Sequence, residues 1–219
     1  MRRRVAFLAC CFMALFLTAC AGKGLEDRIH SVPSQTPILV VGDSLSAAYG
    51  LSSPEQGWVS ILERNLKAEG LLRPDQSVRN ESVSGATVAE GEPRLDSALA
   101  QSSPGLVIIG LGSNDAMRRM PLKDSEDALV RMAEKSKAAG AQVILFGADL
   151  PPQFFFMSTA HVRSMYASAA SRSGAYLLPN ILSGVNSRSD LMLPDGLHPS
   201  SAGQKPMADA VRAAAGRLR

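Results

Sequence analysis

A serine that follows an apolar strand is the residue of this chain whose position points most directly to chemistry. Ser44 comes after the apolar residues 38–41 and Gly42-Asp43. The apolar run predicts a buried strand. The turn after it would present Ser44 at the carboxyl edge of a sheet, where a helix can begin and where open α/β folds bind ligands. A serine hydroxyl becomes a nucleophile when a base removes its proton. Ser44 is therefore a candidate nucleophile if a base lies at the same edge.

An aspartate and a histidine three residues apart are the candidates for that base. Asp195 and His198 lie in a predicted turn before the last predicted helix. A carboxylate that accepts a hydrogen bond from one ring nitrogen keeps the imidazole in the tautomer that can take a serine proton. Standing alone, this spacing is more typical of a surface turn with a helix cap. The other histidines, His30 and His161, do not follow a predicted strand.

Three hydrogen-bond donors are candidates for an oxyanion hole. Ester hydrolysis places negative charge on the carbonyl oxygen, and a donor aimed at it contributes ~2.7–4 kcal/mol. The candidates are the backbone N–H groups of Ser44 and Gly85 and the side-chain amide of Asn114. Each follows a predicted strand, so all three are expected at one edge of the sheet, although singly such residues are usually turns or caps. We interpret Asp43 and Asp115 as structural residues that accept hydrogen bonds from backbone N–H groups.

Four short blocks carry a family resemblance. They are Gly42-Asp43-Ser44-Leu45-Ser46, Gly85, Gly112-Ser113-Asn114-Asp115 and Asp195-Gly196-Leu197-His198-Pro199. In this order they resemble the SGNH, or GDSL, hydrolase family over the chain from about residue 37 to the C-terminus. The resemblance implies Ser-His-Asp catalysis without metal or cofactor, with Ser44, His198 and Asp195 as the triad.

Within that family the chain looks most like the bacterial multifunctional thioesterase, arylesterase and lysophospholipase group. The similarity lies in Leu45-Ser46-Ala47-Ala48-Tyr49 and Gln56-Gly57-Trp58. It implies activity on thioesters, aryl esters and lysophospholipids. Ala86 departs from the group, which more often has an acidic residue there, and this leaves the substrate preference open. The absence of a Gly-x-Ser-x-Gly sequence argues against the α/β-hydrolase arrangement, and the histidines form no metal-binding pattern.

Alternating strands and helices are expected to position these residues. Apolar runs predict strands over 37–42, 77–80, 106–111, 142–146 and 175–178, and helical patterns cover 57–68, 93–100, 125–139, 159–173 and 206–217. Continuous apolar strands are typical of parallel sheets covered on both faces. The prediction is an α/β fold, a three-layer α/β/α sandwich with a flavodoxin-like five-stranded parallel sheet in the order 2-1-3-4-5.

The N-terminal residues resemble an export signal. Residues 1–19 combine three arginines, an apolar run too short for a comfortable membrane span, and small residues before Cys20. Leu17-Thr18-Ala19-Cys20 resembles the lipobox of bacterial lipoproteins, which predicts an acylated Cys20; the alternative is an ordinary signal peptide with an incidental cysteine. We expect a signal over 1–19, a lipidated tether over 20–36, and one hydrolase domain over 37–219 on the periplasmic side of a bacterial cell envelope.

Composition excludes several other classes. All three cysteines lie at or before position 20, so the predicted domain contains no internal disulfide. Without residues 1–19 the chain has 20 basic and 20 acidic residues, and this balance gives no electrostatic case for nucleic acid. The length fits one domain, and we expect a monomer.

Two loops at the predicted catalytic edge are rich in apolar side chains. Met117, Met120 and Leu122 follow the third strand, and Phe154 and Phe155 follow the fourth. Flexible methionines and clustered aromatics suit a groove for acyl chains, although each residue could equally pack the rim of the core.

Together these features predict an exported, lipid-anchored serine esterase or thioesterase that works through an acyl-Ser44 intermediate. Two alternatives stay open. One is an O-acetylesterase that acts on envelope sugars. The other is a lipoprotein that binds a lipid or glycan in the same cleft without catalysis.

Overall fold

A five-stranded parallel sheet forms the centre of the molecule. The computed structural model describes residues 37–149 and 159–218. The strands are β1 (Ile38–Gly42), β2 (Val78–Asn80), β3 (Leu106–Gly110), β4 (Gln142–Phe146) and β5 (Tyr176–Leu178). They pair in the order β2-β1-β3-β4-β5, which confirms the predicted topology. The expected signal, the tether, Cys20, Phe154 and Phe155 lie outside the described residues.

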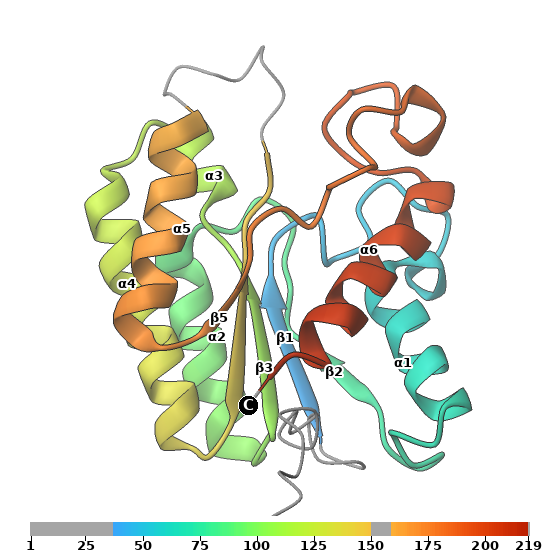
Figure 1. The fold of residues 1–219 in the computed structure, drawn as a ribbon, viewed down its shortest axis with the longest axis horizontal. Coiled ribbons are helices and arrows are strands. Elements are labelled where there is room, and N and C mark those ends of the chain that lie inside the picture. Colours follow the sequence, from blue (N-terminus) through green and yellow to red (C-terminus); the bar gives the residue numbers. More distant parts are fainter. Residues whose placement is uncertain (1–36, 150–158, 219) are drawn as a thin grey trace, which may run out of the picture.

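Helices cover both faces of the sheet and complete the predicted three layers (Figure 1). The helices are α1 (Trp58–Ala68), α2 (Val88–Gln101), α3 (Ser113–Met117), α4 (Leu122–Ala138), α5 (Thr159–Ser173) and α6 (Ser201–Ala215), with short 3-10 turns at Pro54–Gln56 and Ser189–Leu191. Figure 1 shows α1 and α6 on one side, and α2, α4 and α5 on the other. No helix in the described part of the chain has the length and apolar character to cross a membrane.

The central strands β1, β3 and β4 are buried because both of their faces contact helices. Leu39 and Val41 of β1 pack in the core beneath α2, α4 and α5, whereas Ile38 and Val40 pack in the core beneath α1 and α6. Every residue of β1 and β3 is buried. This double burial is the physical reason for the continuous apolar runs in the sequence.

Helices α2, α4 and α6 begin earlier than their sequence patterns predicted, and α2 and α6 differ most. Helix α2 starts at Val88, where Thr87 and Glu90 form a reciprocal capping box, and Pro93 lies inside the helix instead of at its start. Helix α6 starts at Ser201, so Pro206 is its sixth residue and not in the first turn. In both cases the sequence pattern places the proline in the first turn, but the helix accommodates it further along.

Candidate active site

Ser44 lies just beyond the carboxyl end of β1. The prediction of a helix starting here is wrong, because residues 44–50 form a series of turns. The N–H groups of Ser46 and Ala47 both donate to the carbonyl of Asp43, and this closes the first turn. The side chain of Asp43 accepts a further hydrogen bond from the N–H of Leu45 at 3.0 Å. The turn therefore holds Ser44 at the sheet edge without a helix.

Ser44, His198 and Asp195 form one hydrogen-bonded chain. The Oγ of Ser44 lies 2.8 Å from Nε2 of His198, and Nδ1 of His198 lies 2.7 Å from Oδ2 of Asp195. The other carboxylate oxygen of Asp195 accepts from the N–H groups of Leu197 and His198 at 2.9 and 3.0 Å. Partial burial raises the pKa of Asp195, but the hydrogen bonds from His198 and Leu197 outweigh it and hold that pKa below its usual value. Asp195 therefore stays ionised and can orient the imidazole.

Asn114 lies in the first turn of α3, a short helix that the sequence did not predict. Gly112 precedes this helix with a φ of 115°, and a Cβ there would lie 2.9 Å from the hydroxyl of Tyr166. The Nδ2 of Asn114 donates to Oδ2 of Asp43 at 3.3 Å and to the carbonyl of Ala86 at 3.1 Å. Both amide hydrogens therefore already have acceptors. An oxyanion bound by this amide must replace one of them.

The carboxyl groups of Asp43 and Asp115 accept hydrogen bonds from the segments that carry the site residues. Asp43 is buried, and this burial raises its pKa to about 7 against the hydrogen bond from Leu45 that lowers it. Asp115 accepts from the N–H of Val88 and from the hydroxyl of Ser125. Both aspartates thus bond backbone N–H groups, as their sequence positions suggested.

Gly85 lies in the loop after β2, with a left-handed backbone at φ 79°. Its carbonyl accepts a hydrogen bond from Nη2 of Arg118 at 2.8 Å. Arg118 immediately follows α3, and its N–H bonds the carbonyl of Asn114. Arg118 therefore ties the Gly85 loop to the helix that carries Asn114.

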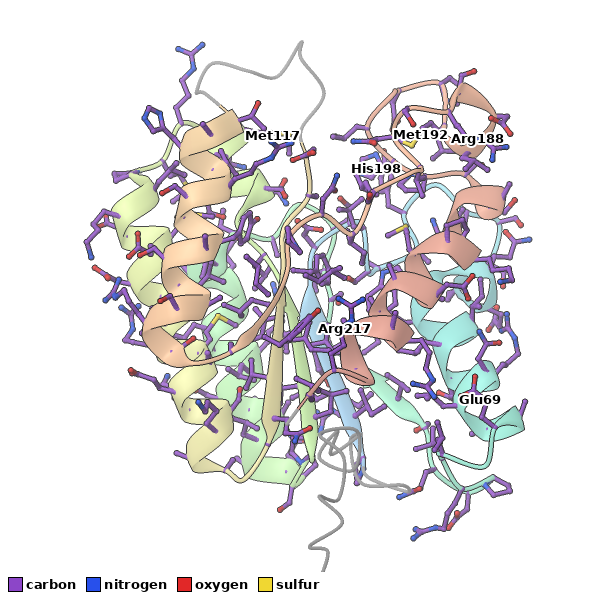
Figure 2. All side chains as sticks on the ribbon, viewed as in Figure 1. Glu69, Met117, Arg188, Met192, His198 and Arg217 are labelled. Atoms are coloured by element: carbon purple, nitrogen blue, oxygen red, sulfur yellow. The ribbon has the colours of Figure 1, made fainter. Side chains whose placement is uncertain are left out.

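A cleft opens beside the triad. Its lining residues are Asp43, Ser44, Leu45, Ser113, Asn114, Met117, Ala148, Asp149, Leu182, Leu197 and His198. Figure 2 shows Met117 and His198 in the upper part of the same view, near the carboxyl edge of the sheet. Met120 and Leu122 do not line this cleft. Met120 lies in a separate hollow with Pro121, and Leu122 packs against the core beneath α4 and α5.

Comparison with known proteins identifies the family. The profile of the GDSL-like Lipase/Acylhydrolase family matches residues 40–205 of the chain. The chain belongs to this family. This hydrolase is therefore an enzyme that acts on ester bonds. Ser44, His198 and Asp195, which the family resemblance implied as the triad, lie within hydrogen-bonding distance of one another at the carboxyl edge of the sheet.

Two curated relatives and one solved structure are similar to this hydrolase over most of its length. Esterase TesA of Pseudomonas aeruginosa is 40% identical over 87% of this chain and 92% of its own. Thioesterase 1/protease 1/lysophospholipase L1 of Escherichia coli (strain K12) is 31% identical over 78% of this chain and 79% of its own. The psychrotrophic esterase EstA from Pseudoalteromonas sp., in a crystal structure inhibited by monoethylphosphonate, is 34% identical with a TM-score of 0.73 and covers 81% of this chain and 94% of its own. These similarities support esterase and thioesterase function.

The sequence reasoning missed one charged residue in the hydrolase cleft. Asp149 follows β4 and makes a two-pronged ion pair with Arg163 of α5, at 2.8 and 2.6 Å. It also accepts from the amide of Asn180 at 3.0 Å. Its place after a strand was the available signal, since the other site residues share it. Among the described residues of the hydrolase, no cluster of three His, Cys, Asp or Glu side chains could hold a metal ion.

Proposed function

We propose that this hydrolase cleaves acyl esters and thioesters through an acyl-Ser44 intermediate. The observation that carries the proposal is the continuous hydrogen-bonded chain from Ser44 through His198 to Asp195. This is the arrangement that activates a serine hydroxyl, because the base is already within proton-transfer distance and its other nitrogen faces a carboxylate. We also propose a monomer as the active unit; the triad is complete within one chain, so this chemistry needs no residue from a second copy.

Acylation begins with attack by Ser44. As its Oγ forms a bond to the acyl carbon, its proton passes to Nε2 of His198, and the resulting imidazolium is stabilised by Asp195. The carbonyl oxygen becomes negative and accepts hydrogen bonds in the oxyanion hole, for which we propose the N–H groups of Ser44 and Gly85 and the amide of Asn114. The bond to the leaving alcohol or thiol then breaks, and His198 gives this group its proton.

Deacylation repeats these steps with water. His198 removes a proton from a water molecule while the water oxygen attacks the acyl carbon. The second tetrahedral intermediate collapses as the bond to Ser44 Oγ breaks, and His198 returns a proton to that oxygen. The products are the free acid and the original enzyme.

We propose small acyl esters, acyl thioesters and lysophospholipids as the substrate class. The names of the relatives from P. aeruginosa and E. coli support this class. The cleft supports it as well, because Met117, Leu182 and Leu197 give it an apolar wall beside Ser44 that suits an acyl chain. Met120 and Leu122 are no part of this proposed groove.

We also propose that the enzyme is exported and lipid-anchored on the periplasmic side of a bacterial cell envelope. The support is the pattern of residues 1–19 followed by Cys20. A lipid on Cys20 would place the domain at a membrane surface, where lysophospholipids and other single-chain esters are present.

Labelling with a fluorescent fluorophosphonate tests the proposed chemistry. The wild type is expected to become labelled, and Ser44→Ala to lose both label and hydrolysis of p-nitrophenyl esters. Ser52→Ala, which changes an exposed serine near the nucleophile turn, serves as the matched control and should behave as the wild type. Hydrolysis by a folded Ser44→Ala protein would overturn the assignment. The acyl-chain profile then separates two substrate classes: activity on acetate alone favours a sugar deacetylase, and activity on longer acyl esters favours the proposed class.

A further inference from the structure

Tyr49 contacts the imidazole of His198 directly. The centroids of the two rings are 4.4 Å apart, and their planes are inclined by 42°. The Tyr49 side chain is half exposed, and with Val83 it is one of the two large apolar or aromatic residues found exposed in the described part of the chain.

The backbone on both sides of Tyr49 is held in an unusual conformation. Ala48 has a φ of 57° and Gly50 has a φ of 73°, and the left-handed region is unfavourable for alanine. A Cβ on Gly50 would lie 2.4 Å from Cδ1 of Leu193, so the turn packs tightly on the loop that carries Asp195 and His198. The strained turn fixes Tyr49 against His198.

We propose that Tyr49 is a positioning residue that holds the His198 imidazole on Ser44 and stabilises its protonated form. The face of an aromatic ring carries partial negative charge and attracts a cation. His198 becomes a cation when it takes the proton of Ser44, and the ring of Tyr49 then lies next to this charge. Its attraction adds to that of Asp195, which is hydrogen-bonded to the other ring nitrogen. The inference rests on the proposed acyl-Ser44 mechanism.

The alternative role for Tyr49 is a platform on which an aromatic leaving group stacks. The two roles make opposite predictions. A residue that acts through the imidazolium matters most when the leaving group needs the proton of His198, as an alkoxide does. A stacking platform matters most for an aryl group, and its loss appears in KM.

The experiment compares Tyr49→Phe and Tyr49→Leu with the wild type on ethyl butyrate and p-nitrophenyl butyrate, which share one acyl group. Tyr49→Leu is expected to lower kcat/KM about tenfold on the ethyl ester and less on the p-nitrophenyl ester, with the loss in kcat. Tyr49→Phe keeps the ring and should retain most of the activity. Tyr176→Leu is the matched control, because it removes a tyrosine ring at the opposite end of the sheet. Thermal unfolding of each variant checks that the fold is intact.

Three results would overturn the inference. They are unchanged kinetics in Tyr49→Leu, a larger loss on the aryl ester with a raised KM, or a loss in Tyr49→Phe equal to that in Tyr49→Leu. Each leaves the proposed function standing if the wild type is active and labelled at Ser44. A wild type that neither reacts with fluorophosphonate nor hydrolyses either ester would instead contradict the proposed function itself.

Discussion

The buried carboxyl group of Asp43 should make the stability of the protein depend on pH near neutrality. Asp43 is 2% exposed, and burial raises its pKa from 3.8 to about 7, with a smaller contribution from the nearby charge of Asp115. In the folded state the carboxyl group therefore keeps its proton over a pH range in which the unfolded chain has lost it. Stability from this group is fully present below pH 3.8 and is lost as the pH rises through 7.

The size of the effect follows from the two pKa values. A shift of about 3 units corresponds to ~4 kcal/mol in all, of which roughly 2–3 kcal/mol is lost between pH 5 and pH 8. For a domain of this size that loss lowers Tm by roughly 5–10 °C. Carboxylates with lowered pKa values, such as those of Asp195 and Glu92, change stability in the opposite sense but only at more acid pH. Asp43 is thus the dominant carboxylate in this window.

Urea unfolding at pH 5, 6, 7 and 8 measures this dependence. The wild type should lose roughly 2–3 kcal/mol across the series. In Asp43→Asn the side chain cannot ionise, so the free energy of unfolding of this variant should not fall over the same pH range. Its activity is expected to fall, because the new amide lies against that of Asn114. Wild-type stability that stays constant or rises over this range would refute the reasoning. It would mean that the hydrogen bonds from Leu45 and Asn114 keep the carboxylate ionised in spite of its burial.

Four further changes test other parts of the molecule. Asn114→Ala should lower kcat by ~10²–10³ with little change in KM, and a rise in KM alone would make Asn114 a substrate-binding residue. An apolar groove should make kcat/KM of the wild type rise from acetate to medium-chain esters, by ~0.8 kcal/mol for each buried methylene. Met117→Ser should flatten this rise, and an equal loss of kcat/KM on acetate would contradict the groove. Thr87→Ala removes the cap of α2 and should cost ~1 kcal/mol in urea unfolding with kcat unchanged. Cys20→Ser should prevent incorporation of labelled palmitate in an export-competent bacterial host; a wild type that takes up no palmitate would contradict the anchor.

The three central strands could be predicted from sequence because helices cover both of their faces. β1, β3 and β4 then appear as nearly continuous apolar runs. The edge strands β2 and β5 are shorter and less buried, but the five predicted strands still match the observed ones to within a residue or so. The starts of α2 and α6 are less predictable, because a proline is typical of the first turn of a helix, whereas Pro93 and Pro206 lie further inside. The reciprocal hydrogen bonds of Thr87 and Glu90 mark the true start of α2, and this pairing was visible in the sequence as a threonine three residues before a glutamate.

The position of the site residues at one edge of the sheet could also be predicted from the strands. Residues that follow parallel strands must meet at one edge of the sheet, whatever the loops between them do. The direction in which a loop side chain turns is not fixed this way. Met117 ends α3 and lines the cleft, but Arg119 then adopts a φ of 59° and Met120 donates its N–H back to the carbonyl of Asp115. The chain reverses within three residues, so Met120 lies in another hollow.

The hydrogen-bond partners of Asn114 show a second limit of sequence reasoning and bear on mechanism. Its position predicted a donor at the sheet edge, but the pattern could not reveal that Asp43 and Ala86 already accept both amide hydrogens. A donor that must first leave another acceptor contributes only the difference between the two bonds. A typical internal hydrogen bond contributes ~0.5–1.5 kcal/mol, while a bond to a charged group contributes ~1.5–3 kcal/mol. Replacing the bond to the Ala86 carbonyl is therefore favourable when the new acceptor is a full oxyanion and gives no net gain when it is a neutral carbonyl. Asn114 should bind the transition state and not the substrate, which is why its loss should appear in kcat.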